Sequence, residues 1–271
     1  RLEAAEGVRF CAGDRVMGLA PWAFGPEVVA DARTLVEIPA RLSFEQAATV
    51  PVAYLTAWYA LRDLAGLASG ERVLVHAAAG GVGMAAVPVA RMAGAEVYAT
   101  ASRRKWPALL ALGIPRERLA SSRTVAFADA FRGAGLDVVL DAFTGERVEA
   151  GLSLLAPGGR FIEMGKRDLL DPADVARRHP GVRYRVFELF EAGPERLGQI
   201  LEEVARGLER GDLSPLPSTV FELERAREAF RWMADARHVG RVLLVPGSRR
   251  LVENAGWVLV TGGLAGFGRE G

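Results

Sequence analysis

Cysteine and histidine are scarce in this sequence of 271 residues. Its one cysteine is Cys11, so an internal disulfide is excluded and a reducing compartment such as the cytoplasm is expected. The three histidines, His76, His179 and His238, lie far apart in the chain. A zinc site built from cysteine and histidine side chains is therefore not expected.

Long apolar runs and a strong net charge are also lacking. No run approaches the roughly 20 apolar residues that a membrane-spanning helix needs. The 34 Lys and Arg residues nearly balance the 33 Asp and Glu residues, so neither nucleic acid nor a membrane surface is an expected partner. The chain begins with neither Met nor a signal peptide and stops within a motif, so we expect it to be a fragment of a longer protein.

What the sequence does contain is a regular alternation of short apolar strands and helices from residue 71 onward. Six strands are predicted, at residues 72–76, 96–100, 118–121, 136–140, 160–164 and 182–187. Such strands, joined by helical crossovers, are typical of a mostly parallel sheet with both faces covered. The predicted fold class is therefore α/β, with a doubly wound parallel sheet of the Rossmann type.

The two ends of the chain have a different pattern. Strands are predicted at residues 15–19 and 27–30, before a helix whose start is marked by Ser43 and a glutamine three residues later, a capping box. A long amphipathic helix is predicted at 194–209, followed by a strand, a helix and a strand over 219–247. We expect this last segment to return to a smaller, β-rich domain that the first segment begins.

A glycine-rich loop at residues 76–83 follows the first strand of the sheet and opens a helix. In that position, backbone N–H groups and the positive end of the helix dipole can hold a pyrophosphate. The residues assigned to this cradle are Gly80, Gly81, Val82 and Gly83. Gly83 is also expected to let the helix pack closely on the strand, and Ala78 replaces the usual first glycine. The alternative is a tight turn without a ligand.

The segment after the second strand indicates which dinucleotide would bind. NAD-binding sheets usually carry an Asp or Glu there, about 20 residues after the glycine loop, to hold the ribose 2′-hydroxyl. Residues 100–105 contain no acid and three cations, which attract a 2′-phosphate. NADPH is therefore favoured over NADH, with Ser102, Arg104 and Lys105 holding the phosphate. The alternative is a solvated, basic helix start.

Six stretches of the sequence resemble one protein family. They are residues 13–18, 48–57, 79–83, 161–168, 179–185 and 234–241. The first three resemble zinc-free medium-chain dehydrogenases/reductases, and the last three narrow the resemblance to enoyl reductase domains of type I polyketide and fatty-acid synthases. The resemblance runs from Gly13 to about Val245. Zinc-dependent relatives carry a cysteine-rich lobe near residues 20–26, where this sequence has no cysteine, so no zinc is expected.

This resemblance implies a domain layout and a reaction. Residues 1–38 and 212–247 would belong to a substrate domain whose N-terminal portion is missing, and residues 39–211 to an NADPH-binding Rossmann domain. The reaction would be hydride transfer from NADPH to the β-carbon of an α,β-unsaturated thioester, with a proton added at the α-carbon. The expected partner is an acyl carrier protein that holds the enoyl chain on a phosphopantetheine arm.

Lys166 is the first candidate for catalysis, because it follows a strand at the sheet edge where ligands bind in such folds. Its ammonium could stabilise the enolate and donate the proton. Glu188 is the second candidate, where the family is expected to carry Asp. The alternatives are a solvated lysine and a surface glutamate. Asp168 is either a further acid or a helix cap. Asp141, where related reductases more often carry Asn, either alters cofactor affinity or caps the following helix.

The tail resembles the start of another domain. Residues 257–268 predict a strand followed by a glycine loop of the T-G-x-x-x-G-x-G type, as in short-chain ketoreductases. Residues 248–271 are therefore assigned to a linker and the start of a neighbouring ketoreductase domain. So short a segment cannot form a domain, and the tail is not expected to bind NADPH within this chain. A homodimer is compatible with a synthase.

Two other functions stay open at this stage, because fold alone does not decide function. A stand-alone quinone or enone reductase could share the fold, although the ketoreductase-like tail argues against it. The other possibility is a silent structural domain that only holds its neighbours in place. It is motivated by Asp141 and Glu188, which differ from the residues expected in the family. The first would act on quinones but not on thioesters, and the second would not bind NADPH.

Overall fold

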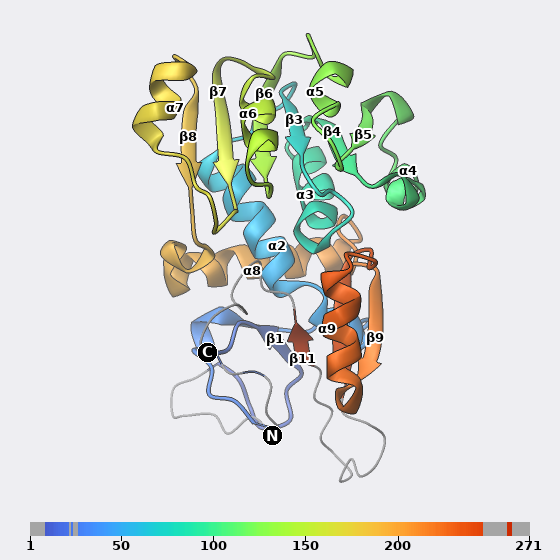
Figure 1. Ribbon diagram of the computed structural model, residues 1–271. Coiled ribbons are helices and arrows are strands. Elements are labelled where there is room, and N and C mark those ends of the chain that lie inside the picture. The colour runs from blue at the N-terminus through green and yellow to red at the C-terminus, as the bar shows by residue number, and fades with distance from the viewer. Residues whose placement is uncertain (1–8, 22, 24–26, 246–258, 262–271) are drawn as a thin grey trace. The chain divides into compact units, whose positions relative to one another are not determined.

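The computed structural model describes residues 9–21, 23, 27–245 and, for the backbone alone, 259–261 (Figure 1). The chain divides into two compact units. The described residues of 9–55 and 192–261 form one, called here the flanking unit, and residues 56–191 form the other, called the sheet unit. No helix in the described part of the chain combines the length and the apolar character that crossing a membrane requires.

The sheet unit is built on six parallel strands in the order β5-β4-β3-β6-β7-β8 (Figure 1). The strands are β3 (Arg72–Val75), β4 (Glu96–Ala101), β5 (Leu119–Ser121), β6 (Leu136–Asp141), β7 (Leu155–Glu163) and β8 (Arg183–Val186). Numbered within this sheet, the order is 3-2-1-4-5-6, which is that of doubly wound nucleotide-binding folds. The predicted fold class and all six predicted strands are confirmed.

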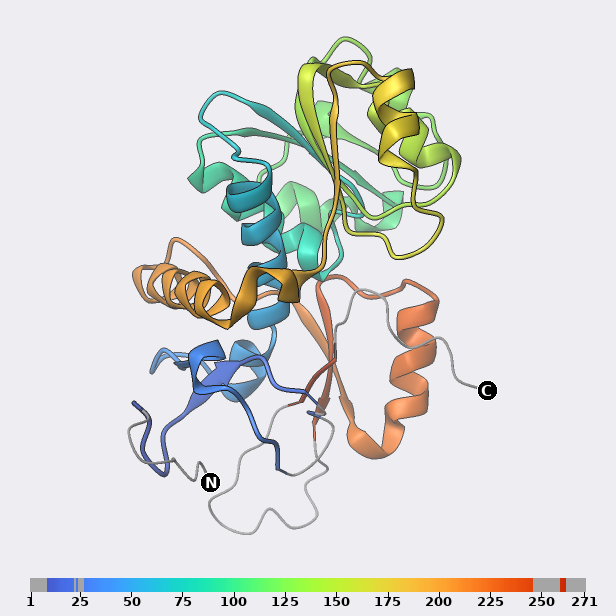
Figure 2. The ribbon, with the colours of Figure 1, turned by 90° about the vertical axis from the view of Figure 1, so that its left-hand side faces the viewer.

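Helices connect these strands and cover both faces of the sheet (Figures 1 and 2). They are α3 (Gly81–Met92), α4 (Trp106–Ala111), α5 (Phe127–Ala130), α6 (Glu146–Leu152) and α7 (Pro172–Arg178). The middle strand β3 is therefore apolar on both sides, with Val73, Leu74 and Val75 fully buried. Phe127 and Phe161 pack into the same core.

The flanking unit holds two small sheets. The strands β1 (Val16–Gly18) and β2 (Leu35–Glu37) pair antiparallel, whereas β9 (Ser218–Glu222) and β10 (Arg241–Val245) pair parallel. The backbone of β11 (Leu259–Thr261) runs antiparallel to β10. The helices are α1 (Phe44–Ala48), α8 (Gly193–Arg210) and α9 (Ala226–Ala234). The remaining helix, α2 (Pro51–Trp58), continues into a π-helical segment, Tyr59–Leu64, within the sheet unit.

Two local predictions in the flanking unit are confirmed. Ser43 caps α1, and Ser43 and Gln46 form the reciprocal hydrogen bonds of a capping box. The helix predicted at 194–209 is α8, whose apolar stripe, including Leu197, Ile200 and Leu201, is buried. Both features depend on residues a few positions apart, which is why the sequence predicted them.

One strand prediction is wrong. Residues 27–30 form no strand, and the side chains of Val28 and Val29 are 39% and 90% exposed. The strand that pairs with β1 is instead β2, with Val36 buried at its centre. Two β-branched residues in succession form a strand only where a partner strand and a buried face exist. Val28 and Val29 have exposed side chains and are not paired with a strand in the described residues.

Some predictions concern residues that the structure does not describe. The ketoreductase-like glycine loop falls on residues 262–268, outside the described residues, and only β11 of that tail is seen. The cysteine-free segment 20–26 is described at residues 20, 21 and 23 only. The functional domain boundaries at residues 38 and 211 stay predictions, since division into compact units does not assign a function to either unit.

Candidate functional site

The glycine loop of the sheet unit has the geometry of an anion site. The strand β3 ends at Val75, and α3 begins at Gly81 with Gly80 as its N-cap. Gly80 donates its N–H to the carbonyl of Ala77 at 2.8 Å, which closes a tight turn. No side chain among the described residues caps this helix of 12 residues. Its first N–H groups, at Gly81 to Gly83, therefore stay available to an anion on the helix axis.

The close approach predicted for Gly83 is present. A Cβ on Gly83 would lie 2.5 Å from Cα of Ala78, closer than real atoms approach, so only glycine fits. The left-handed residue of the turn is Ala77, with φ of 50°, rather than Ala78. Ala78 is fully buried and donates its N–H to Thr100 at 2.9 Å. Because Ala78 has no positive φ, alanine serves where the usual pattern has its first glycine.

The three residues predicted to hold a 2′-phosphate lie together at the carboxyl end of β4. Oγ of Ser102 is buried and has no hydrogen-bond partner among the described residues. Residues 103–105 form a short 3-10 turn that continues into α4. Burial lowers the pKa of Lys105, and the positive charges of Arg104 and Arg123 lower it further. Three cations therefore influence one another here, an arrangement that a bound anion would stabilise.

Arg123 joins Arg104 and Lys105 in a cluster of cations, called here the basic cluster. The sequence did not predict that Arg123 belongs to it. It stands two residues after β5, the strand that pairs with β4 through Ala101 and Ser121. The carboxyl ends of adjacent parallel strands meet at one sheet edge, so Arg123 lies beside Lys105 although 18 positions separate them. The signal available in the sequence was a cation shortly after the third predicted strand, residues 118–121.

Lys166 and Glu188, the two predicted catalytic residues, are in direct contact. Nζ of Lys166 lies 2.8 Å from Oε1 of Glu188 and donates to the carbonyl oxygen of Phe187 at 3.3 Å. The strands β7 and β8 are neighbours, with Glu163 opposite Val186, so the loops that follow both strands leave the same edge. The Lys166 side chain is 28% exposed and that of Glu188 is 71% exposed. The lysine is thus held against the sheet while the acid faces solvent.

Asp141 and Asp168 do not cap helices. Asp141 accepts a hydrogen bond from the N–H of Phe143 at 2.8 Å, but α6 begins only at Glu146, after Gly145. The cap of α7 is Asp171, which accepts from the N–H of Ala173. The helix-cap alternative that the sequence left open for Asp141 and Asp168 is therefore wrong, because both helices begin a few residues later. Asp168 instead has φ of 52° in the loop after Lys166.

A buried polar cluster joins the ends of the four strands β3, β4, β6 and β7, and of its members only Asp141 was considered as a site residue from the sequence. Nε2 of His76, at the start of the glycine loop, lies 3.7 Å from Oδ1 of Asp141, and both side chains are fully buried. Nδ1 of His76 lies 2.9 Å from Oγ1 of Thr100. Glu163, the last residue of β7, is the register partner of Asp141. Burial lowers the pKa of His76 to about 3, so its imidazole is neutral.

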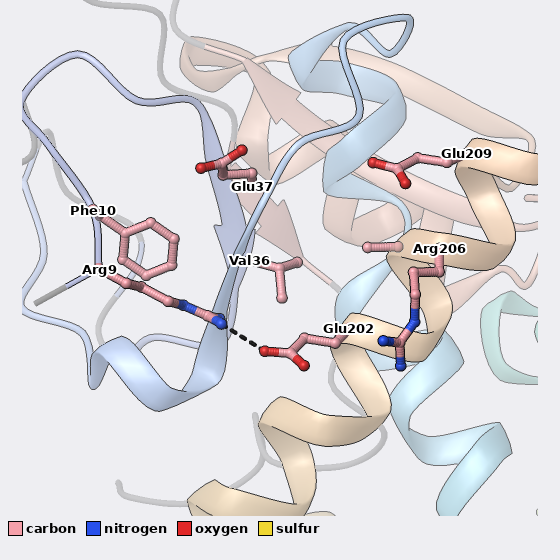
Figure 3. Close-up of a pocket in the computed structure, with 8 residues that line it drawn as sticks. Arg9, Phe10, Val36, Glu37, Glu202, Arg206 and Glu209 are labelled. Atoms are coloured by element: carbon pink, nitrogen blue, oxygen red, sulfur yellow. Dashed lines mark hydrogen bonds and ion pairs between the residues drawn. The ribbon is translucent and has the colours of Figure 1, made fainter.

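A pocket of about 270 Å³ lies in the flanking unit (Figure 3). Arg9 and Glu202 point toward one another across it and form an ion pair at 2.5 Å. Phe10 and Val36 line it beside α8. It contains none of the predicted site residues. Across the described ranges there is also no group of three or more His, Cys, Asp or Glu side chains that could hold a metal ion.

Comparison with known proteins identifies the chain. Residues 117–244 match the family model described as zinc-binding dehydrogenase. The pikromycin polyketide synthase component PikAII of Streptomyces venezuelae is 55% identical over 260 residues, which is 94% of this chain and 7% of PikAII. Several other curated relatives are also polyketide synthases, and the chain spans only 5% to 16% of their length.

Solved structures agree with these relatives. The crystal structure of CurK enoyl reductase is 39% identical with a TM-score of 0.79, and the match covers 88% of this chain and 74% of that one. The nucleotide-binding subdomain of the enoylreductase domain of PpsC from Mycobacterium tuberculosis is 40% identical with a TM-score of 0.53, over 61% of this chain and 97% of the subdomain. The chain therefore belongs to the enoyl reductase domains of modular type I polyketide synthases, within the medium-chain dehydrogenase/reductase family.

Proposed function

We propose that this chain is an active, NADPH-dependent enoyl reductase domain. Its substrate would be an α,β-unsaturated acyl thioester carried on the phosphopantetheine arm of an acyl carrier protein. The observation that carries the proposal is the contact between Lys166 and Glu188 at the carboxyl edge of the nucleotide-binding sheet. It places a cation and an acid together at the edge where doubly wound sheets bind their ligands.

The residues present fit NADPH. The uncapped start of α3 would hold the pyrophosphate through the N–H groups of Gly81, Val82 and Gly83, with Gly80 making the turn. Ser102, Arg104 and Lys105 would hold the 2′-phosphate, joined by Arg123. The buried hydroxyl of Ser102 has no hydrogen-bond partner among the described residues. This supports the assignment, because a buried donor without a partner is costly unless a ligand satisfies it. The absence of an acid after β4 favours NADPH over NADH.

Lys166 is the residue we assign to the acyl group. Bound NADPH supplies the hydride for the β-carbon. The Lys166 ammonium would lie against the thioester oxygen and stabilise the negative charge that develops there. The same group would donate a proton at the α-carbon, directly or through a water molecule. Glu188 fixes the direction of the ammonium through their ion pair and, being exposed, can help return a proton from solvent.

We infer the partners of this domain from its membership of the enoyl reductase family. The acyl carrier protein delivers the substrate, and a ketoreductase domain would neighbour this one, as the tail sequence predicts. A homodimer of the parent synthase is part of the same proposal. Residues 1–38 and 212–247 would contribute to the substrate domain.

The test uses the full-length synthase that carries this chain. NADPH oxidation would be followed by absorbance with a crotonyl thioester, with a simple quinone and with NADH in place of NADPH. Thioester-dependent oxidation that needs Lys166 and is much slower with NADH is the expected result. Oxidation with the quinone alone would indicate a quinone or enone reductase. If neither substrate is reduced and the reductase site binds no NADPH, the domain is a silent structural one.

A further inference from the structure

Two buried carboxyl groups face one another at the ends of β6 and β7. Asp141 and Glu163 are opposite each other in the strand register, and they are 0% and 2% exposed. Neither is part of the chemistry assigned to Lys166 and Glu188. Two acids in such a place require a physical account, because burying a charge without compensation is costly.

Each carboxyl group binds the backbone of the loop that follows its own strand. Asp141 accepts from the N–H of Phe143 at 2.8 Å, and Glu163 accepts from the N–H of Gly165 at 2.5 Å. The residue after Gly165 is Lys166. A side chain at position 165 would overlap the Glu163 carboxyl group, so glycine is needed for this contact. Glu163 thereby fixes the backbone from which the catalytic lysine extends.

The groups around Asp141 and Glu163 can compensate one negative charge on the two carboxyl groups. Burial raises the pKa of both carboxyl groups, and the charge of Glu163 raises that of Asp141 further, well above its usual range. The titratable or charged groups that face the pair from neighbouring elements are His76 after β3, Arg147 on α6 and Tyr184 on β8. His76 is neutral, so Arg147 is the one cation among these three. Arg147 lowers the pKa of Asp141 in part, and a single cation can compensate one negative charge, so we expect one proton between the two carboxyl groups.

We propose that Asp141 and Glu163 share one proton, and that the Glu163 carboxylate, held in this way, positions Lys166 for reaction through the N–H of Gly165. Glu163 is a positioning residue, because it acts through another group. The inference rests on the proposed role of Lys166 in thioester reduction. It adds the hydrogen bond from the N–H of Gly165 to Glu163, which holds the backbone beside Lys166 in place.

The experiment compares three variants in the full-length synthase. Glu163→Ala removes the acceptor for Gly165. Glu163→Gln keeps an oxygen that can accept from Gly165 and gains an amide that can donate to Asp141. Glu149→Ala is the matched control, because it removes an acid of the same unit that pairs with Arg178 and His179 instead.

Hydrogen exchange at the Gly165 amide is the first readout, and it does not require activity. Glu163→Ala should speed this exchange by about tenfold, the equivalent of one lost hydrogen bond, whereas Glu163→Gln and Glu149→Ala should not. Turnover of the crotonyl thioester is the second readout. Glu163→Ala should lower kcat by about 100-fold through misplacement of Lys166, with NADPH affinity unchanged, and Glu163→Gln should restore most of that loss.

A double-variant comparison separates positioning from general damage. In a Lys166→Ala background, Glu163→Ala should cost no further activity, because its effect passes through the missing lysine. Equal and independent losses would overturn the inference, as would a Glu163→Ala protein with wild-type exchange at Gly165. If the parent reduces no thioester but Gly165 exchange follows the expected pattern, the proposed function fails while the anchoring by Glu163 stands.

Discussion

Nζ of Lys166 lies 2.8 Å from Oε1 of Glu188, although 22 positions separate the two residues in the chain. They meet because β7 and β8 are adjacent and parallel, so the loops after both strands leave the sheet at the same edge. The lysine is largely covered and the glutamate largely exposed. This difference suggests unequal roles, with Lys166 against the substrate and Glu188 toward solvent.

We therefore expect Lys166→Ala to lower kcat for thioester reduction by about 100-fold or more, since the developing oxyanion loses its cation. The affinity for NADPH should not change, because the proposed cofactor residues are elsewhere on the sheet edge. Turnover and fluorescence titration with NADPH measure the two quantities. A Lys166→Ala synthase with wild-type turnover would remove Lys166 from the mechanism.

Glu188→Gln should have a smaller effect, a loss of about tenfold or less, because exposed ion pairs contribute little. The amide still accepts a hydrogen bond from Lys166 but cannot relay a proton. The loss should appear in kcat rather than in KM. A loss as large as that of Lys166→Ala would show that Glu188 itself touches the reacting atoms.

The basic cluster after β4 and β5 should decide between the two nicotinamide cofactors. Lys105→Ala and Arg123→Ala should each weaken NADPH binding by about 10- to 100-fold, the usual cost of one charge-assisted contact, and leave NADH binding unchanged. Arg132→Ala is the control, because Arg132 is an exposed cation of the same unit that pairs with Asp129. Equal losses for NADPH and NADH would mean that the cluster does not read the 2′-phosphate.

Gly83→Ala should destabilise the sheet unit by about 1–3 kcal/mol, because its Cβ would meet Cα of Ala78. Gly80→Ala is the comparison for stability, since a Cβ there lies 3.3 Å from the carbonyl oxygen of Ala77 and φ is −83°. Denaturant unfolding of the two variants measures the difference. Similar stabilities would contradict the close contact at Gly83.

The buried acid pair predicts an unusual dependence of stability on pH. The pKa of Asp141 is raised in the folded state, so its contribution is fully present below about pH 4, its unfolded value, and declines as pH rises toward the folded value. Asp141→Asn has no such proton, and its amide can donate to Glu163. The variant should therefore be more stable than the wild type at pH 8.

Unfolding of both proteins between pH 4 and pH 8 measures this difference. The neutral His76 titrates in both and cancels in the comparison. The advantage of Asp141→Asn should disappear toward pH 4. An Asn variant that is less stable at every pH would contradict the raised pKa of Asp141.

The sequence by itself determined the features that depend on neighbours in the chain. The capping box of Ser43, the glycine loop of residues 76–83 and the alternation of apolar strands with helices involve residues within a few positions of each other. Short-range sterics and hydrogen bonds define them. The position of Lys166 directly after a strand was enough to place it at the ligand-binding edge of a doubly wound sheet.

Only the tertiary structure decided which distant residues share that edge. The strand order places Arg123 beside Lys105, and Glu163 opposite Asp141, and neither pairing has a local signal. The failed strand at residues 27–30 has the same origin, because a strand needs a partner that its own sequence does not specify. Residues far apart in the chain come together through sheet register and burial, and these depend on the free energy of the whole fold.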